Sequence, residues 1–163
     1  VKRIAKTLGG ELPNGVPRRT FWIAAIHAGY STGQRYGDLR RIETRRIDKS
    51  GKITFRQHKT GNVVTVRFSV KALKWIQRHQ QHLVIPNPHT QKWFCEHFAR
   101  LVARAGIREG TFKWLRRTAG SYADQARHGN GPKLLGHASR RVFDQSYNVR
   151  EITEREPVEP PKL

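Results

Sequence analysis

Three basic side chains of this 163-residue sequence stand at positions where they could bind a phosphate group. Arg35 follows Thr32-Gly33-Gln34 at the expected start of a helix, where free backbone N–H groups and the helix dipole attract anions. Lys113 and Arg116 are three residues apart, so they share one face of the helix that Thr111 is expected to cap. Two positive charges on one helix face repel each other unless an anion lies between them. Taken alone, each of these residues is better explained as a solvated surface residue.

Three further side chains could transfer a proton or attack a phosphorus atom. Lys59 stands before Thr60-Gly61 in an expected β-turn, and His137 follows the short pair Leu135-Gly136. Tyr147 lies ten residues after His137, across one expected helix. Taken alone, Tyr147 is better explained as a residue at the edge of the core, because it stands at the end of a basic helix.

The hydrophobic pattern predicts an α+β fold that is mostly α-helical, with one small three-stranded antiparallel sheet. Between Pro17 and Ala28, the run from Phe21 to Ile26 is apolar around its whole circumference, which predicts a buried helix that ends at Gly29. A second helix is expected from Arg35 to Ile42. Alternating side chains and two turns then predict the three strands within residues 42–68, and the turn that carries the lysine joins the second strand to the third.

Four further helices are expected after the sheet. Ser69 can cap the first of them, and Gly129–Pro132 ends the third. The last helix runs from about Arg141 to Tyr147. The apolar stripes of the first three are, in order, Val70, Leu73 and Ile76; Phe94, Phe98, Leu101, Val102 and Ala105; and Leu115, Ala119, Tyr122 and Ala126. Lys113 and Arg116 therefore lie off the predicted apolar stripe of their helix.

The chain is long enough for one domain. Residues 1–16 are rich in Gly and Pro and are expected to be a lead-in or linker, residues 17–150 the folded domain, and residues 151–163 an acidic, Pro-containing tail. The sequence contains no Met, even at residue 1, which predicts a processed chain or an excised fragment, and the fragment is favoured. Cys95 is the only cysteine, which excludes an internal disulfide and is typical of a reducing compartment.

The charge balance favours a nucleic acid as partner. Lys and Arg total 32 against 12 Asp and Glu, which gives a net charge of +20 and an isoelectric point of about 11.3. A folded domain this basic repels itself unless a polyanion is its counter-ion. The sequence lacks an apolar run of the ~20 residues that a membrane span needs, and it lacks the basic low-complexity arms of ribosomal proteins. DNA or RNA is therefore the first candidate partner.

Taken together and in this order, five motifs resemble the catalytic domain of the tyrosine recombinases, the phage-integrase family. They are Thr32-Gly33-Gln34-Arg35, Lys59-Thr60-Gly61, Leu115-Arg116-Arg117-Thr118, Leu135-Gly136-His137 and Tyr147. The resemblance runs from about Phe21 to Tyr147. Each motif alone is a weak match, whereas the five in this order are specific to the family. The resemblance implies that residues 17–150 form an integrase-like catalytic domain.

The resemblance also implies a site-specific recombinase or integrase that cleaves and rejoins DNA strands without a metal ion or another cofactor. Tyr147 would attack a backbone phosphate to form a 3′-phosphotyrosyl intermediate and leave a free 5′-hydroxyl. Arg35 and Arg116 would bind the non-bridging oxygens of that phosphate. Lys59 would protonate the leaving 5′ oxygen, and His137 would hydrogen-bond the phosphate or assist proton transfer.

Lys113 departs from the family pattern, because most recombinases have His at this position. A lysine there resembles the type IB topoisomerases, and it keeps a donor to the phosphate while removing a base that works at neutral pH. Topoisomerase-like DNA relaxation and a basic DNA-binding module without catalysis therefore stay open as alternatives. Asp38, three residues after Arg35, matches the acidic position of the family and is expected to orient an arginine or to cap the helix.

The partner that the resemblance implies is double-stranded DNA. The full-length protein is expected to form a homotetramer on DNA, and this fragment a monomer without a membrane partner. The expected location is the cytoplasm, in a bacterial or phage-encoded system. The tail after Arg150 is expected to pack on a neighbouring subunit, to fold back on the basic body or to remain disordered.

Overall fold

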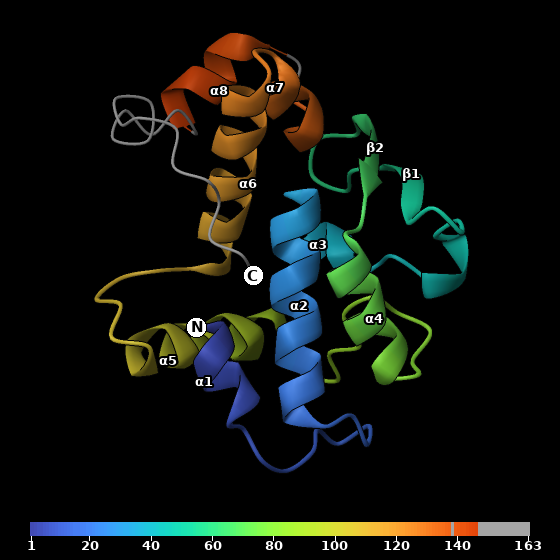
Figure 1. The fold of residues 1–163 in the computed structure, drawn as a ribbon, viewed down its shortest axis with the longest axis vertical. Helices are drawn as coiled ribbons and strands as arrows, with labels where there is room; N and C mark the ends of the chain where they lie inside the picture. Colours follow the sequence, from blue (N-terminus) through green and yellow to red (C-terminus); the bar gives the residue numbers. More distant parts are fainter. Residues whose placement is uncertain (138, 147–163) are drawn as a thin grey trace.

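The computed structural model describes residues 1–137 and 139–146 of the chain (Figure 1). Along this part of the chain the elements are α1 (Lys2–Lys6), α2 (Arg18–Thr32), α3 (Tyr36–Leu39), a 3-10 helix (Thr44–Arg46), β1 (Lys52–Arg56), β2 (Val63–Arg67), α4 (Val70–Arg78), α5 (Gln91–Arg104), α6 (Phe112–Ala126), α7 (Asn130–Leu135) and α8 (Arg140–Ser146). The predicted fold class, mostly helical with a small antiparallel sheet, is confirmed.

Helix α2 lies in the middle of the fold, and α1, α4 and α6 pack around it (Figure 1). Its residues from Phe21 to Gly29 are buried, because this segment is apolar on nearly every side. The predicted end of the helix at Gly29 is wrong, since the helix continues to Thr32 and ends at Gly33, whose φ is 63°. Gly29 serves packing instead, because a Cβ atom there would lie 2.6 Å from the ring of Phe112.

The sheet is a hairpin of β1 and β2, with one strand fewer than the sequence predicts. The inward side chains of the hairpin alternate along both strands and are buried: Ile53, Phe55, Val64 and Val66. The segment expected to form the first strand contains the 3-10 helix Thr44–Arg46 and pairs by a single bridge between Glu43 and Leu83. Its backbone exchanges hydrogen bonds with residues 82–84, which are not part of the hairpin.

Residues 1–16, expected as a lead-in or linker, contribute to the core. Helix α1 packs on α2, and the side chains of Ala5, Leu12 and Val16 are buried. A backbone hydrogen bond of 2.9 Å from Leu12 to Val16 closes the turn between them. The Gly and Pro residues of this segment shape turns that return the chain to the core.

Helices α4 and α5 follow the predicted pattern closely. The hydroxyl of Ser69 accepts a hydrogen bond of 3.2 Å from the backbone of Ala72, which confirms the predicted cap of α4. Ile76 is buried as expected, whereas Val70, in the first turn, is 68% exposed. Helix α5 buries the predicted side chains Phe94, Phe98, Leu101 and Val102.

Helix α6 turns a different face toward the core than the predicted stripe. Phe112, Arg116 and Ala119 are buried, whereas Leu115 is only partly buried. Positions three and four residues apart share one face of a helix. Because Phe112 and Ala119 face the core, Arg116 between them is carried into the interior as well.

Helix α7 packs on α6, and α8 packs on α7 (Figure 1). Phe143 of α8 is fully buried against Gly131, where a Cβ atom would lie 2.5 Å from its ring. The Asp124 carboxylate of α6 accepts hydrogen bonds from the backbone of Gly129 (2.8 Å) and Gly131 (3.3 Å). It also accepts two from the guanidinium of Arg140, at 2.8 and 3.2 Å, so one carboxylate joins α6, α7 and α8.

Candidate functional site

A cleft of about 840 Å³ lies between the start of α3, the turn after β1, helix α5 and the start of α6. Four of the predicted site residues line it: Arg35, Lys59, Lys113 and Arg116. They come from three segments that are far apart in the sequence, and all four carry a positive charge. The cleft is therefore suited to an anionic group.

Arg116 is the most deeply buried of these cations, with 2% of its surface exposed. One terminal nitrogen of its guanidinium donates a hydrogen bond of 2.7 Å to the Gly33 carbonyl, and the other donates one of 2.7 Å to the Leu135 carbonyl. These two acceptors are neutral, so they fix the plane of the guanidinium without cancelling its charge. Both lie at the C-terminal ends of helices: Gly33 is the residue after α2, and Leu135 is the last residue of α7.

Arg35 stands directly before α3, as predicted, and is about a quarter exposed. Its guanidinium lies 3.9 Å from the Asp38 carboxylate and donates a hydrogen bond of 3.4 Å to the side chain of Gln57. Asp38 is buried, and its other oxygen accepts a hydrogen bond of 2.8 Å from the backbone of His58. Asp38 thus connects Arg35 to the turn that carries Lys59, which supports the expected orienting role.

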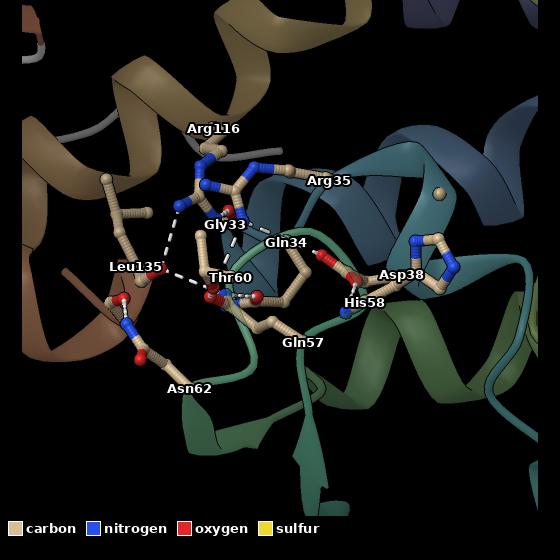
Figure 2. A network of polar contacts seen from close by, with 12 residues as sticks. Gly33, Gln34, Arg35, Asp38, Gln57, His58, Thr60, Asn62, Arg116 and Leu135 are labelled. Atoms are coloured by element: carbon tan, nitrogen blue, oxygen red, sulfur yellow. Dashed lines mark hydrogen bonds and ion pairs between the residues drawn. The ribbon is translucent and has the colours of Figure 1, made fainter.

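A network of buried amides links the two arginines (Figure 2). The side chain of Gln57 donates to the side chain of Gln34 (2.7 Å) and to the Leu135 carbonyl (3.0 Å). Gln34 in turn donates to the Leu134 carbonyl at 2.7 Å. Because Leu135 also accepts the hydrogen bond from Arg116, the network joins the segments just after β1 and α2 to the end of α7.

His137 lies two residues after Leu135 of this network, and its side chain contacts Arg116. Its Nε2 atom is 3.3 Å from the guanidinium of Arg116, and because an arginine can only donate, Nε2 is the acceptor. Burial, followed by the charges of Arg116 and Arg35, lowers the pKa of His137 to about 4. The imidazole is therefore neutral near pH 7 and carries its proton on Nδ1.

Lys59 and Lys113 line the cleft from two segments that are far apart in the sequence, and both are exposed. Lys59 lies in the turn between β1 and β2, as the sequence predicts for a turn between two strands. Lys113 lies in the first turn of α6, one helical turn before Arg116. Both amines can therefore approach a phosphate from solvent, while Arg116 meets it from the interior.

Tyr147, the predicted nucleophile, lies outside the described residues, as does the tail of residues 151–163. Helix α8 is described up to Ser146, the residue before Tyr147. The described part of the chain thus brings Arg35, Lys59, Lys113 and Arg116 to one cleft, with His137 against Arg116.

Gln34 and Gln57 are site residues that the sequence interpretation missed. Each is 1% exposed, although glutamine is mostly a surface residue. One signal in the sequence could have found Gln57: it continues the inward alternation of Ile53 and Phe55. A polar side chain at an inward position needs buried partners, and here they are the amides and carbonyls around the cleft.

Two further properties of the described residues bear on function. No group of three or more His, Cys, Asp or Glu among them is placed to hold a metal ion. Over the same residues, every helix is too short or too polar to cross a membrane.

Comparison with solved structures shows which fold this is. The chain superposes on a lambda integrase dimer bound to a COC' core site with a TM-score of 0.73 and 20% identity, covering 97% of this chain and 59% of that one. For the lambda integrase catalytic core the TM-score is 0.61 at 20% identity, over 72% of this chain and 80% of that one. For the XerH site-specific recombinase bound to its difH substrate, the TM-score is 0.70 at 16% identity, over 88% of this chain and 46% of that one.

The chain spans about half the length of most of these recombinases, 45% and 59% of the lambda integrase dimers and 46% of XerH. No protein-family model matches the sequence, and no curated protein matches it either. At this level of identity the likeness establishes the fold of the chain.

Proposed function

We propose that this chain, which has the tyrosine recombinase catalytic-domain fold, is the catalytic domain of a site-specific DNA recombinase or integrase. The reaction would be cleavage and rejoining of a DNA strand through a 3′-phosphotyrosyl intermediate, with Arg and Lys side chains in place of metal ions. The observation that carries the proposal is that Arg35, Arg116, Lys59 and Lys113 line one cleft, with His137 against Arg116.

The chemistry follows from where these charges lie. A phosphodiester in transfer concentrates negative charge on its non-bridging oxygens, and guanidinium groups held in place beforehand stabilise that charge. Arg116 is held by two carbonyls and Arg35 by Asp38 and Gln57, so both are held in place before DNA binds. We assign to them the binding of the two non-bridging oxygens.

Proton transfer would fall to Lys59, His137 and water. The phenol oxygen of Tyr147 attacks phosphorus and gives up its proton to water or to the neutral His137, and the bond from phosphorus to the 5′ oxygen breaks. Lys59 then donates its proton to that oxygen, which leaves as a hydroxyl. A phosphate bound beside Arg116 would raise the pKa of His137 toward its usual range, because the anion offsets the nearby positive charges.

Double-stranded DNA is the proposed partner. The net charge of +20 supports it, and so do the solved relatives, which include a lambda integrase tetramer bound to a Holliday junction. We extend the proposal to a homotetramer of the full-length protein on DNA. This chain spans about half the length of those relatives, so for the chain alone we propose weak DNA binding and inefficient recombination.

A second candidate is DNA relaxation of the type IB topoisomerase kind. Lys113 favours it, because this lysine lines the cleft one helical turn before Arg116, where most recombinases have His. Both functions would use the same cleft and the same intermediate. They differ in whether the enzyme exchanges strands between two sites or relaxes a supercoiled circle.

The test is covalent trapping on a duplex that is nicked next to the cleaved phosphate, so that the short product diffuses away. We expect a covalent protein–DNA adduct with the wild-type chain and none with Tyr147→Phe, although both bind the duplex equally. Binding without adduct in both proteins would show a DNA-binding module instead of an enzyme. Plasmid relaxation beside a two-site recombination assay, with the full-length protein, then separates the two enzymatic functions.

A further inference from the structure

The side chain of Gln57 forms four hydrogen bonds to different parts of the candidate site. Its side chain is 1% exposed and lies just after β1. The Nε2 atom donates to Gln34 Oε1 (2.7 Å) and to the Leu135 carbonyl (3.0 Å). The Oε1 atom accepts from the Thr60 hydroxyl (2.8 Å) and from the Arg35 guanidinium (3.4 Å) (Figure 2). The amide thus uses both donors and both acceptor positions, which fixes its orientation.

Each partner of this amide belongs to a segment that carries one of the predicted site residues. Leu135, whose carbonyl it shares with Arg116, is two residues before His137. Thr60 directly follows Lys59 in the hairpin turn. The Gln57 amide is therefore one hydrogen bond away from Arg35 and two hydrogen bonds away from Arg116.

The chemistry of an amide suits this place. A carboxylate there would attract Arg35 away from a phosphate and would repel the oxygens of Leu135 and Gln34, whereas an apolar side chain would leave both oxygens without this donor. A neutral amide can bind a guanidinium and a carbonyl at once and leave the positive charge of the cleft intact.

We propose that Gln57 is a positioning residue, which sets the separation of the Arg35 and Arg116 guanidiniums so that they fit the two non-bridging oxygens of one phosphate. This inference rests on the proposed function. It extends that function by a residue that does not touch the substrate and acts through the two arginines.

The experiment compares Gln57→Met, which keeps the length of the side chain without its polar atoms, with the wild type. Gln77→Met serves as matched control, because Gln77 is exposed on α4 and outside the cleft. We expect the single-turnover rate of adduct formation on the nicked duplex to fall by about 10- to 100-fold in Gln57→Met, as misplaced catalytic groups do. The affinity for the duplex should change by less than about twofold, and Gln77→Met should match the wild type in both.

A substrate with a methylphosphonate at the cleavage site separates positioning from general loosening of the fold. Its methyl group replaces a charged non-bridging oxygen, so its transition state depends less on two correctly spaced guanidiniums. We expect the rate loss of Gln57→Met to shrink to less than about threefold on this substrate. The same loss on both substrates, or no loss on either, would overturn the inference.

Thermal unfolding shows whether Gln57→Met is folded. If it is not, Thr60→Val is used instead, because it removes one hydrogen bond to the same amide from an exposed position. We expect Thr60→Val to lose less of the cleavage rate than expected for Gln57→Met, and to lose more of it on the phosphate than on the methylphosphonate substrate. A Thr60→Val rate equal to that of the wild type would then count against the inference. If the wild type forms no adduct, the proposed function is overturned, and this inference with it. If the wild type forms an adduct and Gln57→Met forms it at the same rate, only the inference is overturned.

Discussion

Arg116 illustrates how a single charged residue can be built into a core. A buried guanidinium loses its hydration, which costs free energy unless hydrogen bonds replace the water. The carbonyls of Gly33 and Leu135 supply such bonds at 2.7 Å each. A guanidinium has five donors in one plane, so it can bind both carbonyls and still offer N–H groups to a phosphate.

Replacing Arg116 by Lys tests this role at the residue scale. A single ammonium cannot reach both carbonyls and the phosphate in the same geometry, so we expect the rate of adduct formation to fall by at least about 100-fold, or about 3 kcal/mol of transition-state stabilisation. The measurement is single-turnover cleavage of the nicked duplex at saturating protein.

Arg45→Lys is the control for this substitution, because Arg45 is exposed and pairs with Glu43 outside the cleft. It should cleave at the wild-type rate. An Arg116→Lys protein that cleaves as fast as Arg45→Lys would remove Arg116 from the reaction.

At the scale of elements, the end of α7 is the tightest junction in the site. Gly136 ends α7 with φ 67°, and a Cβ atom there would lie 2.4 Å from Val64 and 2.9 Å from the side chain of Gln57. The site therefore needs a glycine at this position for two reasons, the left-handed backbone and the close approach of β2. The Leu-Gly-His motif has its physical explanation here.

We expect Gly136→Ala to lower the free energy of unfolding by more than about 2 kcal/mol, because it adds a steric clash to the cost of a left-handed alanine. Gly61→Ala is the matched control, since Gly61 has φ 71° but nothing within 4 Å of an added Cβ. It should cost only about 1 kcal/mol. Urea unfolding of both variants is the measurement, and equal losses would contradict the steric account.

The carboxylate of Asp124 connects helix α8 to α6 and α7. It accepts hydrogen bonds from the backbone at the start of α7 and from Arg140 of α8, and it is only 13% exposed. The Arg140 interaction helps to lower the pKa of Asp124 against the effect of burial. We expect Asp124→Ala to destabilise the protein by about 1–3 kcal/mol.

Hydrogen exchange locates this effect. In Asp124→Ala the backbone amides of α7 and α8 should lose protection, while those of α2 keep theirs. Glu96→Ala is the control, because the Lys92–Glu96 pair is exposed and its groups are 3.9 Å apart, so its loss should cost less than about 0.5 kcal/mol. Uniform loss of protection over the whole chain in Asp124→Ala would show that Asp124 is not a local clamp.

At the scale of the whole molecule, the excess of positive charge also affects stability. His27 of α2 is 3% exposed, and burial, followed by the charges of Lys2, Lys71 and Lys6, lowers its pKa to about 4. In the unfolded chain the pKa is that of an ordinary histidine, 6.5. Between these two values the unfolded chain binds a proton that the folded chain does not, so stability falls as the pH falls from about 6.5 toward 4.

We expect His27 alone to lower the free energy of unfolding by about 2 kcal/mol between pH 7 and pH 5. His27→Gln should remove this part of the pH dependence, because glutamine does not titrate. Urea unfolding at the two pH values measures it, with exposed His82→Gln as the control that keeps the wild-type dependence. An equal pH dependence in His27→Gln and the wild type would show that His27 does not titrate in this way.

Local rules were sufficient for most of the elements. The apolar segment of α2, the Ser69 cap of α4 and the spacing of Phe94 and Phe98 in α5 each predict their element from neighbouring residues alone. Local rules wrongly predicted a strand of the hairpin at the start of residues 42–68. The backbone of this segment pairs instead with residues 82–84, which are far along the chain. Local patterns specify an element but not its partner.

The sequence by itself determined the charge of the protein, its fold class and the order of the motifs that carry Arg35, Lys59, Lys113, Arg116 and His137. Only the tertiary structure decided that Arg116 points into the core, and that the amide of Gln57 links it to Arg35. The physical reason is that burial and hydrogen bonding depend on what packs against a residue. An arginine off the apolar stripe belongs in water by pattern alone, and carbonyls at the ends of two helices far apart in the sequence stabilise it in the interior.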